Sequence, residues 1–255
     1  MSEATGELPR RAEYGVDGDF SVVSARWQFA IVVGVEVLLV ALAVRSALVT
    51  DFIGLFAYGV LALALAVTAA SYVRTTLVGK FEVWTGVFAE LGFRGDERVL
   101  DLGCGRGAIL LAAAKLLPRG RAVGVDVWQA DQTGNSAAAT ERNAEVEGVR
   151  QRVELHTGDM TQLSFEGGSF DAVISNLAVH NLPSAAARRA AVDEAVRVLR
   201  PGGRVAIADL AATGHHVARL RELDMTEVRR RNLGWRMWWG PPFGSTHLVT
   251  ATKSV

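Results

Sequence analysis

Two long apolar stretches, separated by only two residues, constrain this chain more than any other feature of its sequence. Residues 27–49 and 52–73 are each as long as the roughly 20 residues that a helix needs to cross a hydrocarbon core. Thr50 and Asp51 lie between them. The pattern predicts two transmembrane helices joined by a tight turn. The open alternative is a buried helical hairpin in a soluble fold, although such helices rarely reach this length without polar residues.

Basic side chains gather at the outer ends of this hairpin. They are Arg10, Arg11 and Arg26 before it and Arg74 and Lys80 after it. Near the turn the sequence offers only Arg45. The positive-inside rule then predicts a two-pass membrane protein with both ends in the cytoplasm, and membrane lipid as a partner. A cleaved signal peptide fits poorly, because a second apolar stretch follows the first at once.

Two features inside the hairpin concern helix packing. Ala62, Ala66 and Ala70 share one helix face, and small residues at this spacing let membrane helices approach closely. A homo-oligomer formed through these helices is compatible with that face. Glu36 lies near mid-span, where a carboxylate is costly. We interpret it as a protonated side chain facing the partner helix, with a substrate or oligomer contact as the alternative.

Composition divides the chain into four parts and limits its partners. Residues 1–26 have no helical or strand period and predict a flexible tail, 27–73 form the hairpin, 74–95 are a linker with an amphipathic helix over 79–92, and 96–255 form one domain. Lys and Arg number 27, as do Asp and Glu, so no nucleic-acid partner is predicted. Cys104 is the single cysteine, which excludes an intrachain disulfide and a cysteine-based zinc site, and we predict no metal.

The domain alternates between strand-like and helix-like segments, which is typical of a parallel sheet with helices on both faces. The predicted strands are 98–102, 122–127, 152–156, 170–175 and 204–209, with helices at 108–117, 136–147 and 184–199 between them. A helix over 216–230 and two strands, 235–239 and 247–252, complete the prediction.

A glycine-rich segment follows the first of these strands. Residues 99–107 read Val-Leu-Asp-Leu-Gly-Cys-Gly-Arg-Gly, and a helix comes next. Glycines suit a loop in which the backbone turns sharply and approaches a ligand closely. Gly103, Gly105 and Ala108 also satisfy the dinucleotide pattern G-x-G-x-x-A, so a nicotinamide oxidoreductase stays open on this loop alone.

Other segments accompany the loop in a characteristic order. Asp101 precedes the glycines, Asp126 ends the second strand, Thr-Gly-Asp-Met at 157–160 follows the third, and Leu-Arg-Pro-Gly-Gly at 199–203 precedes the fifth. Together they closely resemble the class I S-adenosylmethionine-dependent methyltransferases, and in particular the small-molecule enzymes of the ubiquinone, menaquinone and sterol type. The resemblance covers about residues 80–255. It implies a Rossmann-like α/β fold with a seven-stranded, mostly parallel sheet whose last strand is antiparallel.

The same resemblance implies that S-adenosylmethionine is the cofactor and assigns residues to its parts. Asp101 and Gly103 would face the methionine moiety, within a loop that includes Gly105 and Gly107. Asp126 would accept from the ribose hydroxyls, with Val127 and Trp128 beside the adenine. Asp159 would accept from the adenine amino group, with Met160 alongside. Asn176 would line the side near the methyl group.

Acceptor residues are predicted from position and chemistry. His180 follows the fourth strand at the ligand edge of the sheet, and histidine suits a general base near neutral pH. A lining or packing role for His180 is the alternative. Trp238, Trp239 and Phe243 are apolar candidates for an acceptor pocket or a membrane interface.

These features predict a membrane-tethered methyltransferase that acts on an apolar small molecule, such as a quinone, an isoprenoid or a lipid-like acceptor. The acceptor follows from the tethering rather than from pocket residues. Two alternatives stay open, namely a methyltransferase of small thiols or other xenobiotics, and a membrane protein that binds the cofactor without turnover.

Overall fold

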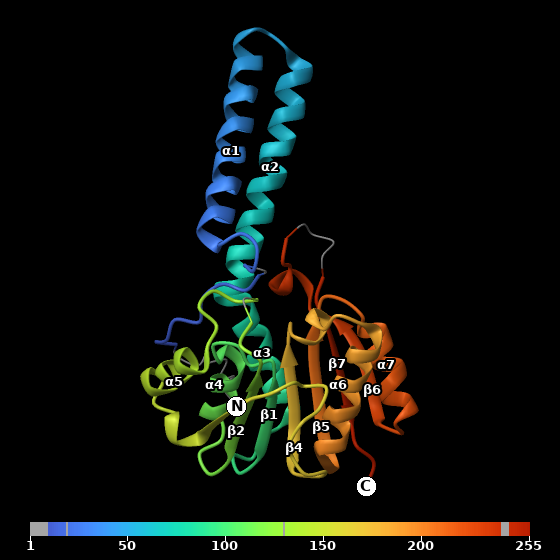
Figure 1. The fold of residues 1–255 in the computed structure, drawn as a ribbon. Helices are drawn as coiled ribbons and strands as arrows, with labels where there is room; N and C mark the ends of the chain where they lie inside the picture. The colour runs from blue at the N-terminus through green and yellow to red at the C-terminus, as the bar shows by residue number, and fades with distance from the viewer. Residues whose placement is uncertain (1–9, 19, 130, 241–244) are drawn as a thin grey trace, which may run out of the picture.

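The computed structural model describes residues 10–18, 20–129, 131–240 and 245–255. A long helical hairpin stands at one end of an α/β domain (Figure 1). Phe243, one of the predicted acceptor residues, lies outside the described residues.

The hairpin consists of α1 (Ala25–Leu48) and α2 (Phe52–Arg74). The turn between them is fixed locally, since Thr50 adopts a left-handed conformation and the Asp51 carboxylate accepts from the N–H of Gly54 at 3.0 Å, capping α2. Both helices are long and apolar enough to cross a membrane by length and composition, and only 6% of each apolar window is buried. One carboxylate oxygen of Glu36 is shielded and has no hydrogen-bond partner among the described residues.

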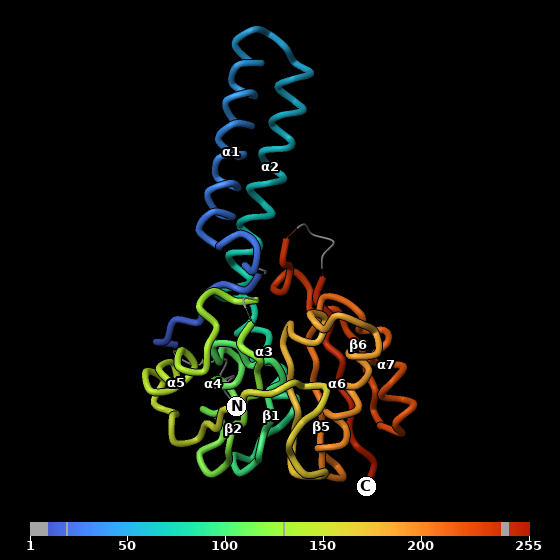
Figure 2. The backbone as a smooth tube through the Cα atoms, viewed as in Figure 1, coloured from blue at the N-terminus to red at the C-terminus, as the bar shows by residue number. Residues whose placement is uncertain are grey.

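No loop separates the hairpin from the domain. A π-helical turn, Thr75–Gly79, joins α2 directly to α3 (Lys80–Leu91), and Figure 2 shows the backbone passing continuously from one to the other. The helix ends at Gly92, whose φ of 58° gives the left-handed C-cap that glycine adopts without strain. Within the predicted linker, 74–95, residues 74–91 therefore form one unbroken helical connection.

Seven strands form one sheet in the order β3-β2-β1-β4-β5-β7-β6. They are β1 (Arg98–Leu102), β2 (Arg121–Asp126), β3 (Val153–Thr157), β4 (Phe170–Asn176), β5 (Leu199–Asp209), β6 (Thr226–Asn232) and β7 (His247–Thr252). The first five pair in parallel, and β7 pairs antiparallel with both β5 and β6. This confirms the predicted fold class.

Helices cover both faces of the sheet through two apolar layers. The elements are α4 (Ala108–Lys115), α5 (Ala137–Val146), α6 (Ala185–Val198) and α7 (Thr213–Glu222). One buried cluster joins the sheet to α3, α4 and α5, and the other joins it to α6 and α7. Ser136 and Ser184 cap α5 and α6 by accepting from N–H groups in the first turn. These layers hold the carboxyl ends of β1, β2, β4 and β5 at one edge.

The C-terminal elements differ from the prediction. The predicted helix over 216–230 stops at Glu222, and the arginines at 229–231 belong to β6. The predicted strand over 235–239 is instead mainly a short 3₁₀ helix, Gly234–Met237. Strand β6 lies at the sheet edge with almost every residue exposed, so it lacks the alternation of apolar and polar residues by which a strand is recognised.

Residues 10–18, which we call the strap, belong to the predicted flexible tail and contact the domain. Its anchor is Glu147 at the end of α5, whose Oε1 accepts from the N–H groups of Arg11 and Ala12 and from the Tyr14 hydroxyl at 2.9–3.0 Å. Further along, Val16 and Thr133 exchange backbone and side-chain hydrogen bonds. Contacts more than 100 residues apart hold this segment, and no local pattern reveals them.

Candidate cofactor and acceptor site

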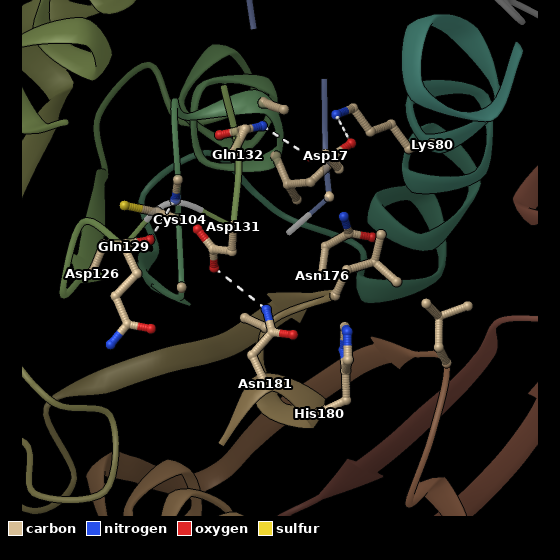
Figure 3. Close-up of a pocket in the computed structure, with 18 of the residues that line it drawn as sticks. Asp17, Lys80, Cys104, Asp126, Gln129, Asp131, Gln132, Asn176, His180 and Asn181 are labelled. Carbon is tan, nitrogen blue, oxygen red and sulfur yellow. Dashed lines mark hydrogen bonds and ion pairs between the residues drawn. The ribbon is translucent and has the colours of Figure 1, made fainter. Parts of the chain in front are cut away.

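A cavity of about 680 Å³ opens at the carboxyl edge of the sheet. Its walls come from the loop after β1, the ends of β2 and β4, the strap, and the foot of α2 (Figure 3). The predicted residues that line it are Asp101, Gly103, Gly105, Asp126, Asn176, His180 and Trp239. The fold thus brings residues from both the predicted cofactor set and the predicted acceptor set to one cavity.

The glycine loop forms one wall. Gly103, Gly105 and Gly107 have φ values of 72°, 50° and 86°, a region that side chains rarely tolerate. At Gly103 a β-carbon would also collide with Ala178, which belongs to the opposite wall. Two of the three glycines are therefore at the cavity surface, and Gly107 instead forms the N-cap of α4.

The N–H groups of this loop are all engaged within the protein. Gly103 and Cys104 donate to the carbonyl of Val125, and Gly107 donates to the carbonyl of Cys104. Gly105 and Arg106 donate at 2.8 Å to the side chains of Asp126 and Gln132. A dinucleotide site presents such N–H groups to a pyrophosphate. The loop observed here instead suits a ligand without phosphates.

Asp101 is the most unusual titratable group of the cavity. The side chain is 2% exposed, and Oδ1 has no hydrogen-bond partner among the described residues. Burial, with a further contribution from the negative charge of Asp126, raises the pKa of Asp101 to about 8. A buried carboxyl group with an unused oxygen in a ligand cavity is suited to a cationic ligand group.

Two more aspartates lie on the β2 side of the cavity. The Asp126 carboxylate accepts from the backbone N–H groups of Gly105 and Trp128 at 2.8 and 2.6 Å, which fixes its orientation at the end of β2. The pKa of Asp131 is raised by burial and by the charge of Asp126. Its carboxylate also meets the Asn181 amide at 3.4 Å, a contact between opposite walls (Figure 3).

His180 and Asp209 form a pair at the opposite wall. His180 lies in a single 3₁₀ turn, Val179–Asn181, after β4, and Asp209 is the last residue of β5. Nδ1 of His180 is 2.5 Å from Oδ1 of Asp209. The backbone N–H of His180 donates to Oδ2 of the same carboxylate at 2.9 Å. Asp209 is fully buried, whereas His180 lines the cavity. The buried carboxylate therefore lies against the Nδ1 edge of the imidazole and is tied to the turn by the backbone N–H of His180.

Residues near the hairpin close the remaining side. Tyr72 at the foot of α2 and Trp239 both line the cavity, with ring centroids 6.1 Å apart. Asn176, at the end of β4, accepts from the Trp84 indole of α3 at 2.8 Å. Trp238 is not among the lining residues, and its backbone carbonyl accepts from the hydroxyls of Ser71 and Thr75.

The remaining predicted cofactor residues lie outside the described cavity. Val127 is 48% exposed, and the Trp128 indole donates to Thr157 at 2.8 Å. Asp159 is exposed and accepts from the backbone N–H of Thr161, and the Met160 side chain lies near Gly103, on the same side as Ala178. Their predicted contacts with ribose and adenine stay predictions.

Sequence reasoning missed four charged residues of the site, one of which is Asp131, described above. Asp17 of the strap and Lys80, the first residue of α3, line the cavity and form an ion pair at 2.7 Å. Asp209 supports His180 from β5. The position of Asp209 at the end of a strand was a usable signal, because ligand-side residues gather there in such sheets. Asp17 and Lys80 carried no such signal.

Comparisons with known proteins agree with this geometry. Residues 99–203 match a family model described as a methyltransferase domain. A nocamycin O-methyltransferase of Saccharothrix syringae is 37% identical over 113 residues, 43% of this chain and 36% of its own. A demethylmenaquinone methyltransferase of Beutenbergia cavernae is 38% identical over 123 residues, 48% of this chain and 44% of its own. The aligned part thus spans less than half the length of these relatives.

A solved structure extends the likeness to the fold. The [4+2]-cyclase SpnF superposes with a TM-score of 0.57 at 18% identity, covering 69% of this chain and 83% of that one. At this identity the likeness concerns the fold alone. S-adenosylmethionine suits the site described above, since it has no phosphate and carries an ammonium group. That group can donate a hydrogen bond to the Asp101 oxygen that has no partner among the described residues.

Proposed function

We propose that this chain, in which residues 99–203 form a methyltransferase domain, transfers the methyl group of S-adenosylmethionine to an apolar small molecule at a membrane surface. The observation that carries the proposal is the extent of the cavity. It runs from Asp101 and the glycine loop to Tyr72 and Trp239 at the foot of the hairpin. One space therefore adjoins both the cofactor residues and the apolar helices.

S-adenosylmethionine, when bound, supplies a methyl group on a sulfonium that needs no further activation. The protein's task is to align the acceptor and to keep water away. Asp101 and the glycine loop hold the cofactor, and Asn176, fixed by Trp84, lines the space between it and His180. Tyr72 and Trp239 supply apolar surface for the acceptor.

His180 acts as the general base for an acceptor that loses a proton on methylation. Asp209 lies against its Nδ1 edge, which leaves Nε2 to take the proton that the acceptor loses on methylation. A base of this kind is useful for a hydroxyl or an acidic C–H group and unnecessary for a thioether. We therefore expect a phenolic or enolic acceptor, of which an isoprenoid quinol is a representative.

The membrane assignment rests on the hairpin. Its apolar side chains are exposed along both helices, including Leu38, Phe56 and Leu63 at 57%, 74% and 66%. Exposed apolar surface of this extent is costly in water, and a bilayer would cover it. The domain then faces the cytoplasm, and the acceptor reaches the cavity from the lipid side near Tyr72 and Trp239. The relative named for demethylmenaquinone supports an acceptor of this chemistry.

The test measures binding and turnover with the protein in liposomes. S-adenosylhomocysteine should bind and NAD should not, and radiolabelled methyl should pass from S-adenosylmethionine to an isoprenoid quinol placed in the bilayer. His180→Ala should lower turnover about 10²- to 10⁴-fold, the usual contribution of a general base, with S-adenosylhomocysteine affinity unchanged.

Other outcomes select the alternatives. Binding of NAD without S-adenosylhomocysteine would overturn the cofactor assignment. Transfer to soluble small thiols that is indifferent to lipid would favour a xenobiotic methyltransferase. Tight cofactor binding with no transfer across quinols, isoprenoid alcohols and thiols would favour a cofactor-binding protein without turnover.

A further inference from the structure

The geometry points to Lys80 as the residue that binds the α-carboxylate of the cofactor, with Asp17 of the strap holding Lys80 in position. This assignment rests on the proposed function, because it takes S-adenosylmethionine as the ligand of the cavity. It adds a recognition element that comes from the helix continuing out of the hairpin and from the N-terminal strap, outside the matched residues 99–203.

Charge complementarity singles out Lys80. Four aspartates line the cavity, namely Asp17, Asp101, Asp126 and Asp131, and among the described lining residues Lys80 is the only lysine or arginine. The methionine part of the cofactor carries an ammonium group and a carboxylate. The aspartates can accept hydrogen bonds from the ammonium group. The carboxylate would be repelled by the negative charges of this cavity unless a cation binds it, and Lys80 supplies that cation.

The other cation close to the glycine loop is directed elsewhere. Arg106 lies between Gly105 and Gly107, yet it is not among the lining residues. Its Nη1 donates to the carbonyl of Thr133 at 3.0 Å, away from the cavity. The glycine loop therefore contributes backbone atoms to the cavity wall, and the positive charge comes from Lys80 of α3.

The ammonium group of Lys80 can bind a second carboxylate in addition to that of Asp17. Its side chain is 1% exposed, and Nζ lies 2.7 Å from Oδ2 of Asp17 (Figure 3). Burial of an ammonium group is costly unless it is paired, so Asp17 keeps the charge in place when no ligand is bound. An ammonium group has three N–H donors, which allows Lys80 to serve Asp17 and a ligand carboxylate together.

Asp17 also connects Lys80 to the glycine loop. Its Oδ1 accepts from Nε2 of Gln132 at 2.8 Å, and Oε1 of the same Gln132 accepts from the N–H of Arg106. The Tyr72 hydroxyl donates to the Asp17 carbonyl at 2.5 Å. Asp17 thus fixes Lys80 relative to the loop that receives the methionine part. Asp101 and Lys80 then serve the ammonium and carboxylate of one amino-acid group.

The experiment compares three ligands of the full-length protein in detergent by calorimetry. They are S-adenosylhomocysteine, its decarboxylated analogue, which keeps the amine, and 5′-methylthioadenosine, which lacks the amino-acid part. The native protein should bind S-adenosylhomocysteine about 10- to 100-fold more tightly than the decarboxylated analogue, as expected for hydrogen bonds to a charged group. In Lys80→Gln this ratio should fall to about one, because the variant lacks the cation that distinguishes the two ligands.

The affinity for 5′-methylthioadenosine reports whether the site remains intact, and it should change less than about twofold in Lys80→Gln, because that ligand has no group for Lys80. If Lys80→Gln fails to fold because Asp17 is left unpaired, the double variant Asp17→Asn, Lys80→Gln removes both charges and serves instead. Asp17→Asn alone should lower the ratio only in part, since Lys80 remains but is less well held.

Two results would overturn the role of Lys80: an unchanged ratio in Lys80→Gln, or an equal loss of affinity for all three ligands. Both are distinguishable from failure of the cofactor assignment on which this proposal rests. In that case the native protein binds none of the three ligands.

Discussion

Asp101 is a residue whose burial opposes the stability of the fold. An aspartate in an unfolded chain has a pKa near 3.9, and burial raises the pKa of Asp101 to about 8. Between these values the folded protein holds a proton that the unfolded chain has released. Stability therefore falls as pH rises through this window. This loss of stability is explained if Asp101 is buried in order to bind a cationic group of the ligand.

Asp101→Asn should separate stability from binding. The amide cannot ionise, so the free energy of unfolding should decline less between pH 5 and 8 than in the native protein, as measured by urea denaturation in detergent. The affinity for S-adenosylhomocysteine should fall about 10- to 100-fold, because a charged hydrogen bond is lost. Asp96→Asn, on an exposed turn, is the matched control and should change neither quantity.

The same group predicts a pH dependence of cofactor binding. Below a pH of about 8 the ligand-free protein carries a protonated Asp101, and a bound ammonium group favours the ionised form. Binding of S-adenosylhomocysteine should therefore release a proton at pH 7, and its affinity should rise between pH 6 and 8. Calorimetry in buffers of different ionisation enthalpy measures the release. Proton release that persists in Asp101→Asn would contradict the assignment of this proton to Asp101.

Asp209 should act on turnover and not on cofactor affinity. Asp209→Asn keeps the shape of the side chain but no longer presents a full negative charge to Nδ1 of His180. We expect kcat to fall at least about tenfold, within the range for general acid–base groups. The dissociation constant for S-adenosylhomocysteine should stay within about twofold, because Asp209 is not among the cavity-lining residues. A loss confined to cofactor affinity would argue against a His180–Asp209 base.

At the scale of elements, the strap depends on one carboxylate. Glu147 accepts from Arg11, Ala12 and Tyr14 and pairs with Lys115 at 2.7 Å. Although its burial acts in the opposite direction, these hydrogen bonds and the ion pair lower the pKa of Glu147 to about 2. A lowered carboxyl pKa stabilises the fold above the unfolded pKa near 4.3, and that stabilisation is lost as pH falls toward 2.

Glu147→Gln should release the strap. The free energy of unfolding should fall by about 1–3 kcal/mol at pH 7, as expected when buried hydrogen bonds to a charged group are weakened. Backbone amides of residues 11–18 should exchange faster in hydrogen–deuterium exchange. Glu145→Gln, on the exposed face of the same helix, should leave both measurements unchanged. Equal exchange in the two variants would show that the strap is held without Glu147.

Elements with a local signal were predictable, and those without one were not. The first five strands and the helices between them carry apolar runs bounded by glycines and caps. The predicted boundaries lie within two residues of the observed ones, except that β5 begins at Leu199 and not at residue 204. Strand β6 is exposed and arginine-rich, so its pattern imitates a helix surface. The strap has no periodicity, because Glu147 and Lys80, distant in sequence, determine its path. His180 was identifiable from its position, whereas its partner required the pairing of β4 with β5.

At the scale of the whole molecule, membrane insertion is the property to test. Native protein should stay in the pellet after carbonate extraction of membranes. Leu63→Lys places a charge at the middle of α2 on an exposed position, and a central lysine opposes insertion by about 2.5–3.5 kcal/mol. The pelleted fraction should therefore fall. Val22→Lys, at an exposed position outside the helices, should have no effect. Native protein in the supernatant would contradict the membrane assignment.

The unbroken helix from α2 through α3 has a kinetic consequence in the proposed arrangement. A flexible tether would let the domain tumble and sample many heights above the lipid, whereas a continuous helix of 40 residues, Phe52–Leu91, holds it at one height and one tilt. Encounters with the acceptor are then a two-dimensional search. Turnover should follow the mole fraction of acceptor in the bilayer and should fall when inert lipid is added at constant bulk concentration.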